Sequence, residues 1–531
     1  MVPGAAICVC KKGAGVLQWG QLNRWFKQGL YFCCLWVVCA VLVGCGREEL
    51  PVINAPEDLA GRNVSTMTGA VFDRVLLQHI PTAKPYYESG MANGLQSLKS
   101  GKCDAIVSDE PVARDLMREN SGIRILCTLA PEEYAYLFSK DNAELCEAFS
   151  RAIRELEADG TIRKIDERWF GNDETVKLPP NLPPDTGKGT IVAATNSGFP
   201  PFSVVVQGRM AGYDPDILAE ICRRLGYGLE FKDMEFSSVI PCVVSGKADL
   251  GFSGISVTPE RKQSALFTEP VYKGGTVLIV RDASAGAAEG TWWQGVKDSF
   301  VRTFVTEARW QMILRGLGIT LLIALCSIAA GTLLAMVVCA MRRSPRAWLR
   351  LPAAAYIAVM RGTPIVVVLM ILYYIVFRSG GIGPVPVAIV GFALNFGAYS
   401  AETFRSGMNA IDPGQLEAAA AMGFSKWRSF LYISLPQAVR HVLPVYKGDI
   451  ISIIKDTSIV GYIAIQDLTK VSDIIRGRTY EAFFPLVATA VIYFLLAYSI
   501  SELVGLVERR IDPQRRRVSL DFIKDTPHDT H

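Results

Sequence analysis

A guanidinium group and several small polar residues lie close together in segment 245–272, SGKADLGFSGISVTPERKQSALFTEPVY. Arg261 carries the rigid fork of N–H donors that binds a carboxylate through two hydrogen bonds. Ser253, Gly254 and Ser256 belong to a turn just before it, where backbone and hydroxyl groups can approach a ligand. Taken singly, each residue fits a structural role better, such as a solvated charge at a helix end. The set together predicts a carboxylate-binding site.

A second unusual stretch, 412–436, reads DPGQLEAAAAMGFSKWRSFLYISLP and is typical of neither a buried span nor a loop. Asp412 can cap a helix whose first residue is Pro413, and Gly423 is a natural stop. An amphipathic piece follows, and we expect Pro436 to end it. The pair is either a plain surface hairpin or a helix that offers a face of alanines to the cleft of a partner.

Several kinds of chemistry lack their motifs. No G-x-x-x-x-G-K-[ST] phosphate loop occurs, since the GKGT at 187–190 lacks the leading glycine. The 13 cysteines include no Cys-x-x-Cys pair, which argues against a zinc site. The formal charge of +4 is small, and the positive clusters flank apolar segments, so nucleic-acid binding has little support. We expect no metal, no cofactor and no enzymatic activity in this chain.

Half of the residues are hydrophobic, so part of the chain must lie in lipid. Basic residues precede an apolar run at 30–44, which is short for a span of about 20 residues but suits a signal peptide. The run ends LVGC, which resembles a bacterial lipobox with Cys45 as the lipidated residue. An uncleaved anchor is the alternative. In both cases the leader, residues 1–45, predicts export of the domain that follows.

The middle of the chain has the short strands, turns and amphipathic helices of α/β domains. A proline-rich linker, VKLPPNLPPDTGKGT, divides it into two pieces. The expected boundaries are 50–175 for the first piece, 176–190 for the linker, 191–283 for the second piece, 284–315 for a connector, 316–511 for an all-α transmembrane domain and 512–531 for a tail.

Five membrane spans are expected, each close to the length of about 20 residues that a bilayer requires. They are 316–341, 352–377, 384–410, 439–465 and 482–507. Arginines cluster after the first and last spans, so the positive-inside rule places both clusters and stretch 412–436 inside and the α/β pieces outside. Charged residues inside the expected spans mark either a transport path or helix packing. They are Arg361, Glu402, Lys447, Asp449, Lys455 and Asp456.

The second piece resembles the first lobe of polar-amino-acid substrate-binding proteins, through TNSGFPPF (195–202), GYDPDILAEICRRLG (212–226) and segment 245–272. The first piece resembles the second lobe of the same family, through GLQSLKSGKCDAIVSDEPVA (94–113) and the ending at Trp169. The resemblance implies a bilobed α/β fold of the periplasmic-binding-protein type.

The resemblance also implies roles in binding a free amino acid, which carries a carboxylate and an ammonium. In these roles Arg261 binds the carboxylate, Asp109 accepts from the ammonium, Phe199 and Phe236 enclose the side chain, and Ser253, Gly254, Ser256 and Gly69 lie on the turns that approach it. Ala70 follows Gly69 where many members have threonine, and Asn196 stands where binders of basic amino acids tend to have an acid. We expect a polar ligand, with a neutral one slightly favoured.

The two lobes occur in inverted order. In the family a strand like 275–282 leads directly into a segment like 52–64, whereas here the first precedes the membrane and the second follows the leader. We therefore expect one circularly permuted binding domain, whose old termini are joined by the proline-rich linker. The alternative is two incomplete lobes that pair between chains.

The order E-A-A, Gly423, Ile433, Leu435 and Pro436 resembles the EAA loop of ABC-importer permeases, which docks on a cytoplasmic ATPase. MRGTPIVVVLM at 360–370 resembles the second-span signature of polar-amino-acid permeases. The resemblance implies docking through Glu417, Ala418, Ala419 and Gly423. It also implies a separate ABC ATPase that binds ATP and magnesium, and a second permease that is a copy or a homologue.

The sequence thus predicts a fused substrate-binding and permease subunit of an ATP-driven amino-acid importer. It would be a multi-pass protein of the bacterial inner membrane, in contact with lipid, with the binding domain outside. A ligand-gated channel would instead predict a pore loop between the lobe-encoding segments, and a sensor would need a cytoplasmic partner domain. A periplasmic enzyme would predict an acid and a base in the cleft.

Overall fold

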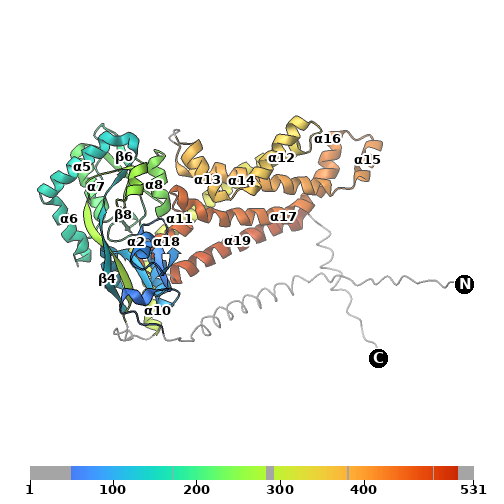
Figure 1. Ribbon diagram of the computed structural model, residues 1–531. Coiled ribbons are helices and arrows are strands. Elements are labelled where there is room, and N and C mark those ends of the chain that lie inside the picture. Colours follow the sequence, from blue (N-terminus) through green and yellow to red (C-terminus); the bar gives the residue numbers. More distant parts are fainter. Residues whose placement is uncertain (1–49, 172, 283–291, 379–381, 482, 512–531) are drawn as a thin grey trace, which may run out of the picture. The chain divides into compact units, whose positions relative to one another are not determined.

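The computed structural model describes residues 50–171, 173–282, 292–378, 382–481 and 483–511 (Figure 1). The predicted leader, the lipidation site at Cys45 and the predicted tail lie outside the described residues.

Two five-stranded sheets form the α/β part of the chain (Figure 1). The sheet of lobe I has the order β11-β5-β10-β6-β9, and the sheet of lobe II has the order β2-β1-β3-β12-β4. The strands of lobe I are β5 (Leu137–Phe138), β6 (Thr190–Thr195), β9 (Gly228–Asp233), β10 (Leu250–Gly251) and β11 (Leu266–Phe267). Those of lobe II are β1 (Asn63–Met67), β2 (Lys84–Glu88), β3 (Ala105–Asp109), β4 (Ile123–Tyr134) and β12 (Tyr272–Arg281). Strands β7 (Val204–Val206) and β8 (Arg209–Ala211) form a hairpin.

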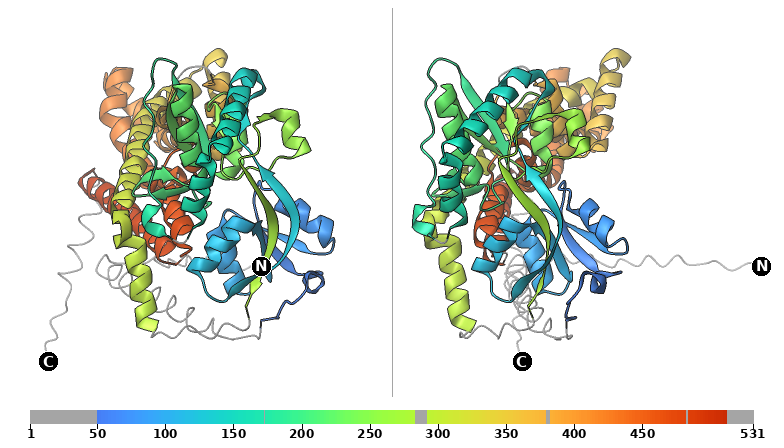
Figure 2. Two further views of the ribbon diagram at one scale, coloured as in Figure 1. Left: turned by 90° about the vertical axis from the view of Figure 1, so that its left-hand side faces the viewer. Right: turned by 60° about the vertical axis from the view of Figure 1, so that its left-hand side comes forward.

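Strands β4 and β12 join the two lobes. They pair antiparallel along their whole length, from Tyr272 opposite Tyr134 to Arg281 opposite Ile123, and Figure 2 shows them as a long ribbon. At one end β4 leads into β5 and β12 follows β11, and both of these partners belong to lobe I. The described chain therefore crosses between the sheets twice, and one chain supplies both lobes.

Helices accompany both sheets. Lobe II contains α2 (Phe72–His79), α3 (Met91–Lys99) and α4 (Glu110–Glu119). Lobe I contains α5 (Ala143–Ala158), α6 (Thr161–Phe170), α7 (Tyr213–Leu225), α8 (Phe236–Val244) and α9 (Pro259–Ser264), and α6 packs on α5 and α7. The indole Nε1 of Trp169 on α6 donates to Asp216 Oδ2 on α7 over 2.7 Å, and Arg168 Nη1 donates to the same oxygen over 2.8 Å. Because Trp169 is buried, this contact fixes the end of the first sequence piece to the lobe that the second piece builds.

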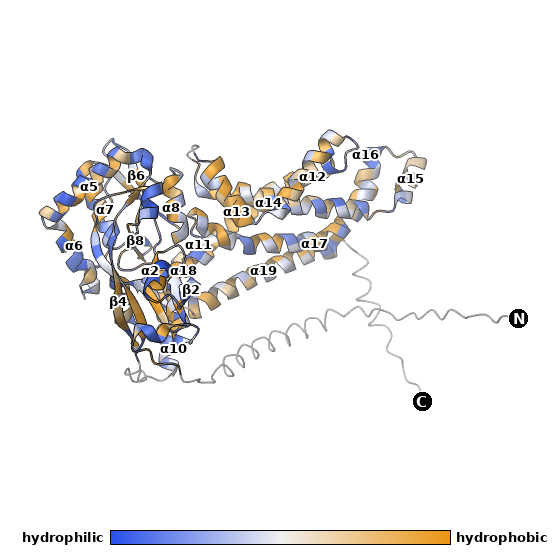
Figure 3. Ribbon diagram, in the orientation of Figure 1, coloured by the Kyte–Doolittle hydropathy of each residue, from blue (hydrophilic) through white to orange (hydrophobic). Residues whose placement is uncertain are grey.

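The second half of the chain is helical. Its helices are α10 (Trp292–Phe300), α11 (Arg309–Arg342), α12 (Ala347–Gly362), α13 (Ile365–Ile371), α14 (Pro384–Asn409), α15 (Pro413–Ala421), α16 (Lys426–Ser429), α17 (Leu435–Asp456), α18 (Leu468–Thr479) and α19 (Phe483–Ile511). Figure 3 shows hydrophobic residues along several of these helices, α13 among them. Glycines let α11 and α14 pack closely, since a Cβ at Gly331 would lie 2.9 Å from the carbonyl oxygen of Ala393.

Within the described residues, three helical segments are long and apolar enough to cross a membrane: Trp293–Arg342, Pro384–Asn409 and Phe483–Glu508. The count rises to four if the pair Ala347–Gly362 and Ile365–Val376, bent by 108°, forms one span. The bend lies inside the expected span 352–377, where Thr363 is extended before Pro364. A residue before proline avoids the helical conformation, which explains the break. The count of five spans stays a prediction, and α17 within the expected span 439–465 ends at Asp456.

The helix predicted after Asp412 is confirmed. Asp412 Oδ1 accepts from the backbone N–H of Gly414 over 2.8 Å, and Gly423 follows α15 with a left-handed φ of 82°. The expected end at Pro436 is wrong, because the chain stays helical from α16 through a π-helical turn (Phe430–Ser434) into α17. Pro436 lies in the first turn of α17, where its missing N–H and its ring cost little.

Candidate functional site

Arg261 bridges the two lobes. Its helix α9 is capped by Thr258, whose hydroxyl accepts from the backbone N–H of Arg261 itself over 3.2 Å. The guanidinium then donates to the carbonyl of Ser256 in lobe I over 2.9 Å and to the carbonyl of Gly69 in lobe II over 3.1 Å. Burial lowers the pKa of Arg261, and the nearby acids Glu132 and Asp109 oppose this shift. The structure therefore brings together Arg261, Ser256 and Gly69, as the predicted site requires.

Asp109 is the acidic end of this cluster. It is the last residue of β3, lies opposite Thr276 of β12, and is only 1% exposed. Its Oδ1 accepts from the hydroxyl of Tyr134 over 2.5 Å. Burial raises the pKa of Asp109 well above its usual value, and the neighbouring Glu132 raises it further. The Tyr134 hydroxyl and Arg261 act in the opposite direction. A ligand cation would therefore meet a carboxyl group whose ionised form is poorly solvated.

Glu132 is a second acid of the site, which no sequence motif predicted. Its two carboxylate oxygens accept from Ser256 Oγ over 2.9 Å and from Thr276 Oγ1 over 2.6 Å. Glu132 precedes Tyr134 by two residues on β4, so both side chains point to the same side of the strand. This period of two is the sequence signal that could have revealed Glu132, provided that β4 had been identified as a strand between the lobes.

A buried aspartate, Asp214, holds the turn that was predicted to approach the ligand. Its Oδ2 accepts from the backbone N–H groups of Ser253 and Gly254 over 3.2 and 3.3 Å. Burial raises the pKa of Asp214 to about 7, against the effect of these two hydrogen bonds. Both turn residues have positive φ, 115° for Ser253 and 58° for Gly254. The turn is thus strained and fixed by one carboxyl group, whose role the sequence analysis did not identify.

The two predicted aromatic residues have different surroundings. Phe199 is 3% exposed, stacks on Phe202 with 6.0 Å between ring centroids, and lies directly against Gly254. Phe236 is partly buried at the start of α8, and a Cβ at Gly69 would lie 3.7 Å from its ring. Phe236 therefore lies beside the Gly69–Arg261 contact, whereas Phe199 is part of the aromatic core. The proposed enclosure of a ligand side chain by these two rings stays a prediction.

The four residues predicted to dock an ATPase lie on and just after α15. Glu417 and Ala418 are exposed, Ala419 is buried and Gly423 is exposed in its left-handed turn. Beside them, Met422 is 76% exposed. Docking of an ATPase on these residues stays a prediction.

A two-lobed α/β domain followed by apolar helices defines a membrane protein that carries a binding domain. The sequence profile of bacterial extracellular solute-binding proteins, family 3, matches residues 191–455. The probable amino-acid ABC transporter permease protein YckA of Bacillus subtilis is 36% identical over 200 residues, which are 37% of this chain and 88% of that protein. The octopine transport system permease protein OccM of Rhizobium meliloti is 34% identical over 215 residues, 39% of this chain and 88% of that protein.

Among solved structures, the crystal structure of an amino acid ABC transporter with histidines is similar, with 32% identity and a TM-score of 0.37. The matched residues make up 42% of this chain and 99% of the chain in that structure. The identities and coverage of the permease relatives show that the chain belongs to the family of amino-acid ABC transporter permeases, with a solute-binding domain fused to the permease helices.

Asp109→Asn should change how the stability of the ligand-free protein depends on pH. Because the folded-state pKa of Asp109 is raised, its contribution to stability is fully present below the unfolded pKa of about 3.9 and is lost as the pH rises through the folded pKa. Each pH unit between the two pKa values corresponds to about 1.4 kcal/mol. The Asp109→Asn protein, which is neutral at this position, should therefore melt at a higher temperature than the wild type at pH 8 and lose this advantage toward pH 4. Parallel melting curves would contradict the burial argument, and exposed Asp141→Asn is the control.

Gly254→Ala should destabilise the protein more than Gly246→Ala. Both glycines have positive φ, 58° and 71°, so alanine suffers backbone strain at either position. A Cβ at Gly254 would lie only 2.8 Å from Phe199 Cε1, whereas a Cβ at Gly246 meets nothing within 4 Å. We expect an additional loss of about 1–3 kcal/mol for Gly254→Ala from this overpacking. Urea unfolding monitored by tryptophan fluorescence measures the difference, and equal losses would refute the close contact.

Proposed function

We propose that this chain is the fused substrate-binding and permease subunit of an ATP-driven importer of amino acids. The observation that carries the proposal is the bridge from Arg261 of lobe I to the Gly69 carbonyl of lobe II, in a chain with amino-acid permease relatives. Two acids of lobe II, Glu132 and Asp109, lie near enough to influence the pKa of Arg261. The exported domain captures the ligand, and the spans translocate it. In contrast with a ligand-gated channel, both lobes precede the first long apolar helix of the described residues.

The site suits a zwitterion. The carboxylate of a free amino acid would replace the Gly69 carbonyl as a partner of the Arg261 fork, because a carboxylate adds an opposite charge and can accept two parallel hydrogen bonds from the guanidinium. The ammonium would pair with Asp109 and favour its ionised form. Asn196 donates through Nδ2 to the Met234 carbonyl over 2.9 Å and places no charge near the pocket, which supports a polar neutral ligand.

We infer that the binding domain is circularly permuted. The match to the solute-binding profile begins at residue 191, just after the proline-rich linker, which supports a family N-terminus at that point. Trp169 at the end of α6 contacts α7, so the linker connects α6 to β6 within lobe I. The new ends, before β1 and after β12, both belong to the sheet of lobe II. The double crossing by β4 and β12 favours pairing of the lobes within one chain over pairing between chains.

The remaining partners are proposals that follow from the family. A separate ABC ATPase, which holds ATP and magnesium, would dock on Glu417, Ala418, Ala419 and Gly423 at the cytoplasmic face. A second permease, either a copy or a homologue, would complete the path through the inner membrane. The leader would anchor the domain outside, by lipid on Cys45 if it is processed. This chain then hydrolyses no ATP itself.

Titration with amino acids tests the binding site. The full chain in lipid nanodiscs is titrated calorimetrically with each of the twenty amino acids in turn. We expect micromolar or tighter binding by a polar member, and a loss of more than 100-fold in both Arg261→Ala and Asp109→Ala, because each leaves a ligand charge unpaired. Exposed Lys140→Ala should bind like the wild type. Binding that is indifferent to Asp109 would refute the two-lobe site.

Purification of the chain from the membranes of its host tests the docking surface. An ATPase subunit should co-purify with the wild type, and Glu417→Lys should remove at least nine-tenths of it, because the substitution reverses an exposed charge at the centre of the surface. Mass spectrometry quantifies the subunit. Glu144→Lys makes the same charge change on the exposed face of α5 and should have no effect. Equal recovery with Glu417→Lys would exclude α15 as the docking element.

A further inference from the structure

Helix α18 lies against both lobes of the binding domain, although it belongs to the permease half of the sequence. It runs from Leu468 to Thr479 between α17 and α19. A small cavity of about 40 Å³ marks the junction. Its lining comes from residues 89–93 of lobe II, residues 196–198 and Glu235 of lobe I, and several residues of α18.

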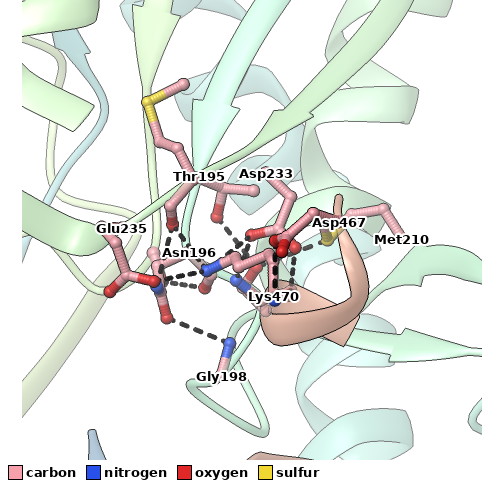
Figure 4. A network of polar contacts seen from close by, with 12 residues as sticks. Thr195, Asn196, Gly198, Met210, Asp233, Glu235, Asp467 and Lys470 are labelled. Carbon is pink, nitrogen blue, oxygen red and sulfur yellow. Dashed lines mark hydrogen bonds and ion pairs between the residues drawn. The ribbon is translucent and has the colours of Figure 1, made fainter. Parts of the chain in front are cut away.

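Lobe I receives a buried cation from α18. Lys470 is 4% exposed, and its Nζ lies 3.2 Å from Glu235 Oε1, 3.2 Å from the carbonyl oxygen of Met234 and 3.9 Å from Asp233 Oδ1. Figure 4 shows Lys470 reaching from its helix toward Asp233 and Glu235 at the end of β9. A buried ammonium without such partners would be very unfavourable, so these groups define the position of α18 on the lobe.

The acidic partners of Lys470 are themselves held in place. Asp233 accepts from the backbone N–H of Ser197 over 3.0 Å and from its hydroxyl over 2.6 Å. The loop after β6 is thereby fixed beside β9. At the next turns of α18, a Cβ on Gly477 would lie 2.9 Å from Gly198 Cα, so the helix and this loop touch backbone to backbone.

Lobe II is held at the other end of the helix. The hydroxyl of Tyr480 donates to Asp115 Oδ2 on α4 over 2.9 Å. Tyr480 is 6% exposed and has a left-handed φ of 53°, a conformation that a bulky residue adopts only when its surroundings enforce it. Tyr480 is therefore held by the end of α18 on one side and by Asp115 of lobe II on the other.

We propose that α18 is the docking helix through which the permease recognises its own binding domain and detects whether the two lobes are closed. Lys470 selects lobe I, and Tyr480 engages lobe II only when the lobes are closed. Lys470 and Tyr480 are ten residues apart, or about 15 Å along a helix. A rigid element of that length cannot keep both contacts if the lobes swing apart on the hinge strands. The detection of closure rests on the proposed function, whereas the docking contacts do not.

The docking contacts are tested on the full chain in nanodiscs, with protease sites inserted after Gly46 and within residues 283–291. After cleavage, the dissociation rate of the binding domain from the immobilised nanodiscs is measured. Glu235→Lys should dissociate at least tenfold faster, because its charge opposes Lys470. Adding Lys470→Glu to Glu235→Lys should slow dissociation at least threefold relative to Glu235→Lys alone, because the charge pair is restored with its signs exchanged. Recovery is incomplete because the carboxylate introduced at position 470 faces Asp233. Lys140→Glu, on an exposed part of lobe I, should match the wild type.

Two results would overturn the assignment of Lys470. One is a wild-type dissociation rate for Glu235→Lys, and the other is a double variant that dissociates no more slowly than Glu235→Lys or Lys470→Glu alone. The urea-unfolding midpoint of each variant separates loss of docking from loss of folding, and Glu235→Lys changes a side chain that is one-fifth exposed. Tyr480→Phe, which removes only the contact with Asp115, should dissociate at least threefold faster. An unchanged rate in this variant would refute the contact with lobe II.

The detection of closure is tested by repeating the dissociation measurement with each amino acid that binds in the calorimetric titration. A bound amino acid should slow the dissociation of the wild type and leave the rate of Tyr480→Phe unchanged. Equal effects on both would overturn the role of α18 in detecting closure. If no amino acid binds, the proposed function fails, while the ligand-free rates of the Glu235, Lys470 and Tyr480 variants still decide the docking contacts.

Discussion

The pairing of β4 with β12 is the constraint on which the α/β part depends. Within the described residues, the chain passes between the two sheets only at β4 and β12. The backbone hydrogen bonds between these two strands hold the crossings side by side. The same register places Asp109 opposite Thr276 and brings Tyr134 and Glu132 to the crossing. The candidate site therefore lies beside the strands that connect the lobes, where Arg261 of lobe I contacts Gly69 of lobe II.

The groups of the site are satisfied by weaker partners than a zwitterion would supply. Arg261 donates to two neutral carbonyls, and one oxygen of the buried Asp109 accepts from a tyrosine hydroxyl. These partners lack the opposite charges that the carboxylate and the ammonium of a zwitterion would bring. The proposed ligand would therefore stabilise this arrangement, which is the balance expected where function takes precedence over stability. Asp214 shows the same balance, since a buried carboxyl group holds a turn with two left-handed residues.

Local signals explain what the sequence could predict. The Asp412 cap, the stop at Gly423 and the short strands depend on neighbours within a few residues, and all three appear in the structure. The combination of Arg261 and Asp109 required a family resemblance, because these residues lie on different lobes. Glu132 and Lys470 were missed for a related reason. Their roles depend on partners more than 100 residues away, Ser256 and Glu235, so a local pattern can indicate at most that Glu132 shares a strand face with Tyr134. The π-helical turn before Pro436 likewise overrode a local stop signal.

Fusion changes what a docking surface between binding domain and permease must achieve. A tethered domain is present at an effective concentration that a free protein reaches only when abundant, so docking needs little affinity. A buried ion pair adds little net stability, because desolvation offsets most of the attraction, but it strongly penalises a misplaced partner. The Lys470 cluster fits this requirement: it fixes the register of lobe I on α18 without holding the domain too tightly. The proposed detection of closure requires a contact with lobe II that is specific and easily broken, and the single hydrogen bond from Tyr480 to Asp115 is such a contact.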